Sequence, residues 1–157
     1  GKSAAEIREY LERTKFDSSI YITVDTLKYL KKGGRITPAA AALGTLLRLK
    51  PVLTIQGEKL DAFAKARTMK QARSMMITAI TRDLENRFDD MTGEKTYIDV
   101  AHTDNDEMAQ ELAAELRELF PETEVRVEPL SLSVACHIGP GALAIAATKK
   151  LEIGSLL

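Results

Sequence analysis

A pair of adjacent glycines, Gly33 and Gly34, places the strongest local constraint on how this chain can fold. Before them, the apolar residues 20–24 are typical of a buried strand, and residues 25–32 have the composition of a short helix. Glycine adopts the left-handed backbone conformation at little cost, and helices commonly end on a residue in that conformation. We therefore predict that the helix ends at this pair, with Gly33 or Gly34 left-handed.

Arg35 follows the glycine pair directly and precedes a second helix start. Thr37 is suited to the N-cap position, and Pro38 to the first helical position. Arg35 thus lies between a helix end and a helix start, where backbone N–H groups and the helix dipole favour an anion. On local grounds a solvated arginine in a helix connection is the simpler interpretation, and an anion site is the functional alternative.

Length and charge predict one globular domain without a nucleic-acid surface. The chain has 157 residues, of which 45% are hydrophobic and 29% charged, as in soluble globular domains. Its 22 basic residues are balanced by 23 acidic residues, so no basic field is available to bind phosphates by counterion release. Four Phe, four Tyr and no Trp leave few side chains that could stack on bases. Nucleic acid is therefore not an expected partner.

The cysteine and histidine content argues against a disulfide or a metal centre. Cys136 is the single cysteine, which excludes an internal disulfide and fits a reducing, cytoplasmic location. Two histidines and one cysteine form no familiar zinc spacing, so we expect no metal and no cofactor. No apolar run is long enough to span a membrane, and the N-terminus lacks the pattern of a signal peptide.

Hydrophobic periodicity predicts an α/β domain with a mixed sheet. Three capping-box spacings mark helix starts, at Ser3 with Glu6, Thr68 with Gln71, and Asp104 with Glu107. The second of these helices should be buried through Ala72, Met76, Ile80 and Leu84, and the third through Met108, Leu112, Leu116 and Leu119. Strands are expected over residues 20–24, 51–55, 59–66, 96–101, 125–127 and 143–147. One hairpin and several crossovers imply parallel and antiparallel pairs in one sheet.

A second informative motif spans residues 134–145, where Gly139-Pro140-Gly141 separates two apolar runs. The two glycines tolerate positive φ on either side of a fixed proline, which makes a rigid turn. His137 comes just before this turn, at the end of what we interpret as an apolar strand. A histidine in such surroundings is often a hydrogen-bonded core residue, but a rigid turn beside it favours a binding site. His102 is interpreted as a surface loop residue without a role.

No catalytic apparatus emerges from the residues. The chain lacks the nucleophile-elbow, phosphate-loop and dinucleotide-binding glycine patterns. Cys136 and His137 do not form a dyad if they are neighbours on a strand, because their side chains then point to opposite faces. Residues 38–49 carry no charge before Arg48, so this helix is either packed between other elements or the wall of an apolar pocket.

Taken together, several segments resemble the bacterial DegV family. They are residues 24–36 (VDTLKYLKKGGRI), residues 50–53 (KPVL), Arg67 with Thr68, and residues 137–142 (HIGPGA). The resemblance implies a two-layer lobe of helices packed on a mixed sheet of about six strands, which agrees with the order of elements above. It also implies that residues 1–157 form a single domain, the C-terminal lobe with a preceding helix over about residues 1–16. The N-terminal lobe would lie outside this sequence.

The resemblance further implies a function. Family members bind a long-chain fatty acid in an apolar tunnel and serve as the non-catalytic, lipid-binding subunit of a fatty-acid kinase. A separate ATP-binding subunit makes the acyl phosphate. The residues that match the family motifs are His137 and Arg35 for the carboxylate. The tunnel and its turns would be formed by Gly34, Ile36, Ala40, Leu43, Gly44, Leu47, Gly139 and Gly141. Cys136 stands where a small polar residue is expected, which removes one possible hydroxyl.

Two alternatives remain open at this stage. The same fold resembles that of dihydroxyacetone kinases, in which a histidine binds a small ketone, and His137 could play that part. A pocket walled by Leu and Ala favours a lipid, because a triose would need several hydroxyl partners. Alternatively, the chain is an interaction lobe without a ligand of its own, which should then expose a large apolar patch.

Overall fold

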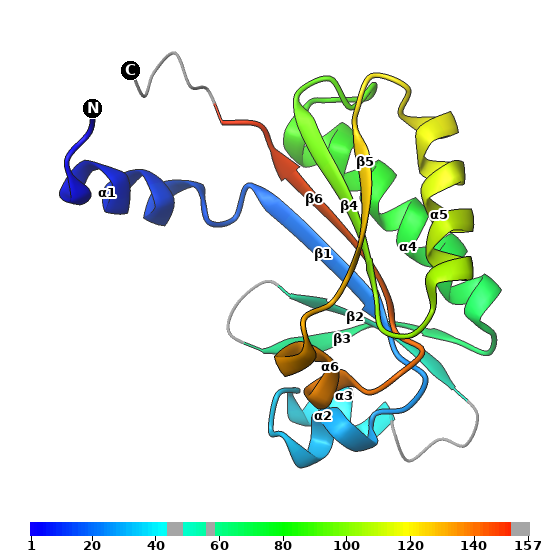
Figure 1. The fold of residues 1–157 in the computed structure, drawn as a ribbon. Coiled ribbons are helices and arrows are strands. Elements are labelled where there is room, and N and C mark those ends of the chain that lie inside the picture. The colour runs from blue at the N-terminus through cyan, green and yellow to red at the C-terminus, as the bar shows by residue number, and fades with distance from the viewer. Residues whose placement is uncertain (44–48, 56–58, 152–157) are drawn as a thin grey trace.

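The computed structural model describes residues 1–43, 49–55 and 59–151 of the chain, and these form one mixed sheet with its helices (Figure 1). The strands lie in the order β3-β2-β1-β6-β4-β5. Their bounds are β1 Ser18–Thr23, β2 Lys50–Ile55, β3 Leu60–Ala66, β4 Thr96–His102, β5 Val125–Pro129 and β6 Leu143–Lys149. All neighbouring pairs are antiparallel except β4 and β5, which are parallel. The α/β class and the six-stranded mixed sheet are confirmed.

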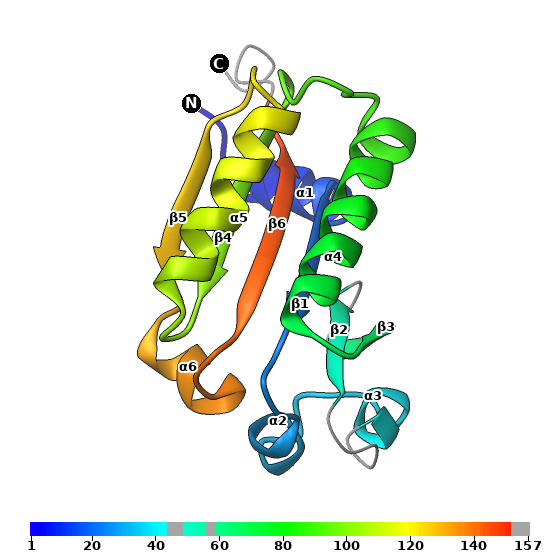
Figure 2. The same ribbon diagram turned by 90° about the vertical axis from the view of Figure 1, so that its right-hand side faces the viewer.

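Helices cover the sheet unequally on its two faces. Their bounds are α1 Ala4–Thr14, α2 Lys28–Lys32, α3 Pro38–Leu43, α4 Met69–Asp83, α5 Asp106–Leu119 and α6 Leu132–Ile138, with a π-helical turn η1 Leu84–Phe88 that continues α4. The two long helices, α4 and α5, lie side by side across one face (Figure 2). The three short helices, α2, α3 and α6, gather at one end of the molecule (Figures 1 and 2). Much of the second face therefore has no helix over it.

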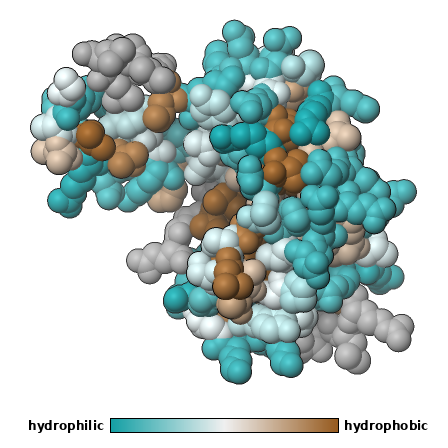
Figure 3. All heavy atoms as spheres, in the orientation of Figure 1, coloured by the Kyte–Doolittle hydropathy of each residue, from teal (hydrophilic) through white to brown (hydrophobic). Residues whose placement is uncertain are grey.

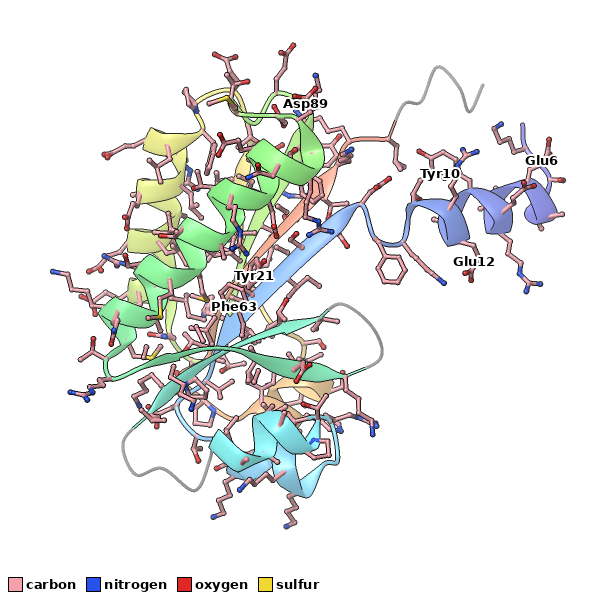
Figure 4. The ribbon with its side chains drawn as sticks, turned by 180° about the vertical axis from the view of Figure 1, so that it is seen from behind. Glu6, Tyr10, Glu12, Tyr21, Phe63 and Asp89 are labelled. Carbon is pink, nitrogen blue, oxygen red and sulfur yellow. The ribbon has the colours of Figure 1, made fainter. Side chains whose placement is uncertain are left out.

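Two hydrophobic clusters follow from this arrangement. The larger lies between the sheet and α4 with α5, and the predicted α4 stripe of Ala72, Met76, Ile80 and Leu84 is fully buried there. Tyr21 and Phe63 meet at its edge with ring centroids 4.7 Å apart (Figure 4). The smaller cluster packs the other face against the short helices through residues that include Ile22, Leu30, Ile36, Leu53 and Ile138. Successive residues of β1 thus belong to different clusters, because their side chains point to opposite faces of the sheet.

The first helix has the predicted start but no buried face. Ser3 accepts the Glu6 N–H while the Glu6 carboxylate accepts the Ser3 N–H, which is the predicted capping box. No residue of α1 is buried, and Ile7 and Leu11 remain 47% and 57% exposed. The helix extends away from the sheet (Figure 1), and of its residues labelled in Figure 4, Glu6 and Glu12 are exposed while Tyr10 is half-buried. Packing therefore contributes little to its stability here.

Three local predictions are wrong. Asp104 is not the N-cap of α5, because it adopts a left-handed conformation with φ 48° and Asn105 occupies the cap. Leu119 is 48% exposed, because α5 ends there and Phe120 takes the buried position instead. The apolar residues before Gly139 form helix α6 rather than a strand. A short apolar run is compatible with either structure, and only packing decides between them.

Candidate functional site

An apolar cavity of about 500 Å³ lies on the face of the sheet opposite α4 and α5. The space-filling view shows hydrophobic surface in the hollow between β1 and the short helices, and on α6 itself (Figure 3). The volume falls within the range of small-molecule sites. The residues that line it are Ile20, Ile22, Leu30, Arg35, Ile55, Leu60, Ala101, Leu130, Ser133, Val134, His137, Ile138, Ala144 and Ala146.

The floor of this cavity is built by paired positions on neighbouring strands. Ile20 pairs with Ala146 and Ile22 with Ala144 across β1 and β6, and Ala101 of β4 pairs with Ala144. These residues alternate along their strands and so share one face of the sheet. Because the β6 and β4 members are alanines, the floor is apolar but leaves space above it that larger side chains would fill.

Within the described ranges, three of the lining residues have polar side chains, namely Arg35, Ser133 and His137. Ser133 and His137 lie one turn apart on α6, and Arg35 comes from the connection between α2 and α3. The structure thus places the two predicted carboxylate-binding residues, about one hundred positions apart in sequence, at the same cavity. Such a lining suits a ligand with a long apolar body and one polar end.

The backbone of Arg35 is held while its charge stays free. Its N–H donates to the Leu30 carbonyl at 3.2 Å, and its carbonyl accepts the Leu60 N–H at 3.2 Å. Among the residues that the structure describes, none forms a hydrogen bond or ion pair with its guanidinium. The preceding Gly34 has φ 63°, the left-handed conformation expected of the glycine pair, and Thr37 caps α3 by accepting the Ala40 N–H. A fixed backbone with an unpaired guanidinium is available to bind an anion.

The orientation of His137 is set by its own helix. Its Nδ1 lies 2.7 Å from the carbonyl oxygen of Ser133, four residues earlier on α6. A carbonyl can only accept a hydrogen bond, so Nδ1 carries the proton and Nε2 is left for a ligand. A neutral His137 could accept the hydroxyl of a carboxylic acid at Nε2, and a protonated one could donate to a carboxylate. In both cases one proton is held between the ring and the head group.

The turn after α6 is held by a residue that the sequence did not reveal. The Thr103 hydroxyl donates to the Gly139 carbonyl at 2.6 Å and accepts the Ala142 N–H at 3.0 Å. Its backbone carbonyl accepts the Gly141 N–H at 2.7 Å. Thr103 is buried at the end of β4, so its hydroxyl joins both ends of the Gly-Pro-Gly turn inside the protein. No local pattern marks this residue, because its partners lie 36 to 39 positions away.

Helices α2 and α6 approach each other at Gly139. The ring of Tyr29 lies against it so closely that a Cβ on residue 139 would be 2.5 Å from Tyr29 Cδ2. Gly139 also has φ 83°, and Gly141 has φ 80°, as predicted for this turn. Glycine is required at residue 139 on both counts. The two sequence motifs are therefore in contact in the folded protein.

Of the other predicted tunnel residues, Gly34, Ile36 and Ala40 are described by the structure and do not line the cavity. Ile36 and Ala40 are buried in the smaller cluster behind it, and Gly34 faces open space. Leu43 ends α3, while Gly44 and Leu47 lie outside the described residues. The described part of the wall is formed by side chains of the sheet, of α2 and of α6. The contribution of α6 was not predicted, because its residues were interpreted as a strand.

His102 and Cys136 have clearer structural settings than the sequence suggested. His102 is buried at the end of β4, and its Nδ1 accepts the Asn105 N–H at 3.2 Å, which stabilises the start of α5. The prediction of a surface loop residue is wrong. Cys136 is exposed on α6 and lines a neighbouring hollow of about 350 Å³ rather than the apolar cavity.

Over the described ranges, no group of three metal-binding side chains occurs and no helix is long and apolar enough to cross a membrane.

Comparison with known proteins decides the family. The sequence model of an uncharacterised protein family, DegV, matches residues 1–150. The chain belongs to the DegV family. A DegV domain-containing protein of Clostridium perfringens is 36% identical over 146 residues, which cover 92% of this chain and 48% of that protein. The protein DegV of Bacillus subtilis is 31% identical over 143 residues, covering 91% and 49%. The chain thus spans about half the length of these DegV relatives.

Solved DegV structures share the fold. A fatty-acid-binding DegV family protein from Streptococcus agalactiae superposes with a TM-score of 0.82 at 25% identity, over 96% of this chain and 51% of that one. A DegV family protein from Thermus thermophilus, described for its fatty acid binding, gives 0.81 at 33% identity over 96% and 52%. DegV from Bacillus subtilis, a fatty acid binding protein, gives 0.78 at 30% identity over 94% and 50%.

Proposed function

We propose that this DegV protein binds a long-chain fatty acid, with the acyl chain in the apolar cavity and the carboxyl group at Arg35 and His137. The observation that carries the proposal is the lining itself, in which eleven of the fourteen described residues are apolar and Arg35 carries their single permanent charge. Three related solved proteins are described as fatty acid binding, which supports the same ligand class. A small ketone would need several hydroxyl partners, whereas Ser133 has the single hydroxyl among the lining residues that the structure describes.

The energetics of this arrangement are favourable. Transfer of each CH₂ group from water to an apolar site contributes about 0.8 kcal/mol, which is reduced by the entropy lost on ordering a flexible chain. A carboxylate removed from water needs charge-assisted partners, and an unpaired guanidinium with an imidazole supplies them. The acyl chain therefore contributes most of the affinity, and the head-group residues select an acid over other lipids.

We further propose that the protein is a non-catalytic, cytoplasmic subunit that presents its fatty acid to a separate ATP-binding kinase subunit for acyl-phosphate formation. On this proposal residues 1–157 are the C-terminal lobe of a two-lobed protein, and hydroxyl groups of the other lobe complete the head-group site. Among the described residues that line the cavity there is no cysteine and no carboxylate, which supports a carrier role. Arg35, exposed at the cavity, is the residue proposed to face the kinase.

Two measurements test the ligand assignment. Mass spectrometry of an organic extract of the purified protein should detect a fatty acid in stoichiometric amount. Calorimetric titration of delipidated protein with hexadecanoate and with hexadecanol should show a preference for the acid. Absence of both a co-purified fatty acid and any binding of hexadecanoate would rule out the proposal.

A further inference from the structure

Gly33 and Gly34 differ in what their backbone requires. Gly34 has φ 63°, which side chains rarely tolerate, so glycine is needed there for the turn. Gly33 has φ −81° and ψ −6°, a right-handed conformation that residues with a side chain adopt freely. Its backbone therefore gives no reason for a glycine at residue 33.

Space for a side chain is limited at Gly33 and open at Gly34. A Cβ on residue 34 would meet nothing within 4 Å. A Cβ on residue 33 would lie 3.1 Å from Cδ2 of His137 and 3.7 Å from Cγ of Arg35. The first of these is shorter than an ordinary van der Waals contact of 3.4–4 Å. The imidazole of His137 thus lies in the space that a side chain at residue 33 would occupy, with the stem of Arg35 beside it.

We propose that Gly33 is a positioning residue for the head group, because its missing side chain lets His137 and Arg35 approach each other. This inference rests on the proposed fatty-acid site and adds a residue to it. Atom Cδ2 neighbours Nε2 in the imidazole ring, so the edge that faces Gly33 adjoins the nitrogen left for the ligand. A methyl group at residue 33 would press on this edge of the ring and displace Nε2 from its position at the head-group site.

His137 has little freedom to accommodate such a methyl group. On one side its Nδ1 is bonded to the Ser133 carbonyl at 2.7 Å. At the C-terminal end of its helix, the Gly139 carbonyl is held by the buried Thr103 hydroxyl. A shift of the ring by a few tenths of an ångström therefore weakens the hydrogen bond to Ser133 or moves Nε2 out of line with the carboxyl group of the ligand. Either change costs affinity for the carboxyl group while the fold stays intact.

The two glycines provide a matched pair of variants. Gly33→Ala should leave the Tm close to that of the wild type, because the lower entropy of its unfolded chain offsets the strain of the contact with His137. Its affinity for hexadecanoate should fall by about tenfold or more. Gly34→Ala should lower the Tm by about 2–4 °C, because alanine resists positive φ, and should bind hexadecanoate within about twofold of the wild type.

Histidine NMR gives a readout that does not depend on the ligand. The chain has two histidines, so the imidazole signals of His102 serve as an internal reference for those of His137. Gly33→Ala should shift the His137 nitrogen and Cδ2–H signals and leave those of His102 in place, whereas Gly34→Ala should leave both unchanged. Wild-type His137 signals and wild-type affinity in Gly33→Ala would overturn the inference. If the wild type binds no fatty acid, the proposed function fails, and the His137 signals still decide whether Gly33 positions the ring.

Discussion

The hydroxyl of Tyr21 donates a 2.8 Å hydrogen bond to the carboxylate of Asp83, which joins β1 to α4 inside the protein. Ser19 donates to the same oxygen at 2.6 Å, and Arg87 donates to it from η1 at 3.2 Å. Arg87 also donates to the Phe16 carbonyl at 2.9 Å, so this network fixes the start of β1 against the end of α4. Burial of a carboxylate is stabilising only when it is paired in this way.

The loss of stability at alkaline pH should depend on the ionisation of the Tyr21 hydroxyl. Burial, together with the hydrogen bond to Asp83, raises the pKa of Tyr21 to about 12. The pKa of an unfolded tyrosine is about 10, so the folded state holds this proton more tightly. Its contribution to stability is therefore complete below about pH 10 and is lost as the pH rises towards about 12. Urea unfolding of Tyr21→Phe should show a shallower decline over that window than the wild type.

Tyr97→Phe is the matched control for this measurement, because Tyr97 is 39% exposed on β4. It should leave both the stability and its alkaline decline unchanged. At pH 8, Tyr21→Phe should cost about 1 kcal/mol, the usual net value of one hydrogen bond. Equal alkaline profiles for Tyr21→Phe and the wild type would contradict the assigned pKa.

Arg35→Ala should separate head-group recognition from stability. Because the guanidinium is without a partner in the described part of the chain, the variant should unfold at the wild-type urea concentration. Loss of a charge-assisted hydrogen bond should weaken hexadecanoate binding about tenfold or more and leave hexadecanol binding unchanged. Lys32→Ala removes an exposed positive charge from α2 and should behave like the wild type. Equal losses for acid and alcohol would show that Arg35 does not contact the carboxyl group.

His137→Ala should weaken hexadecanoate binding by about tenfold, because it removes the second head-group partner. The measurement is calorimetric titration, accompanied by circular dichroism to verify that the variant is folded. Cys136→Ala is the control, since Cys136 is exposed on the same helix and does not line the cavity. If the affinity of His137→Ala equals that of Cys136→Ala, His137 has a structural role alone.

Thr103→Val should destabilise the protein through the turn that follows α6. The variant keeps the side-chain shape but removes the hydroxyl that bonds Gly139 and Ala142, which leaves buried backbone groups unsatisfied at a cost of about 1–3 kcal/mol. Thr103→Ser retains the hydroxyl and should recover most of this loss in urea unfolding. A Thr103→Val protein as stable as the wild type would mean that these bonds contribute nothing net.

Local sequence patterns determined several features of this protein correctly. The capping box at Ser3, the N-cap at Thr68 and the left-handed Gly34 each depend on residues a few positions apart. The periodic stripe of α4 also predicted its buried face. In all these cases the interaction that decides the structure lies within one or two helical turns, where a single sequence suffices.

Tertiary structure alone decided the remaining features. Whether the apolar residues before Gly139 form a helix or a strand depends on what packs against them. The role of Thr103 could not be predicted, because its hydroxyl bonds residues 36 and 39 positions away. The sequence marked Arg35 and His137 separately, but their meeting at one cavity depends on the contact between α2 and α6. Gly33 is the clearest example. Its sequence context explains a glycine by the turn, whereas the fold explains it by the ring of His137 that lies against it.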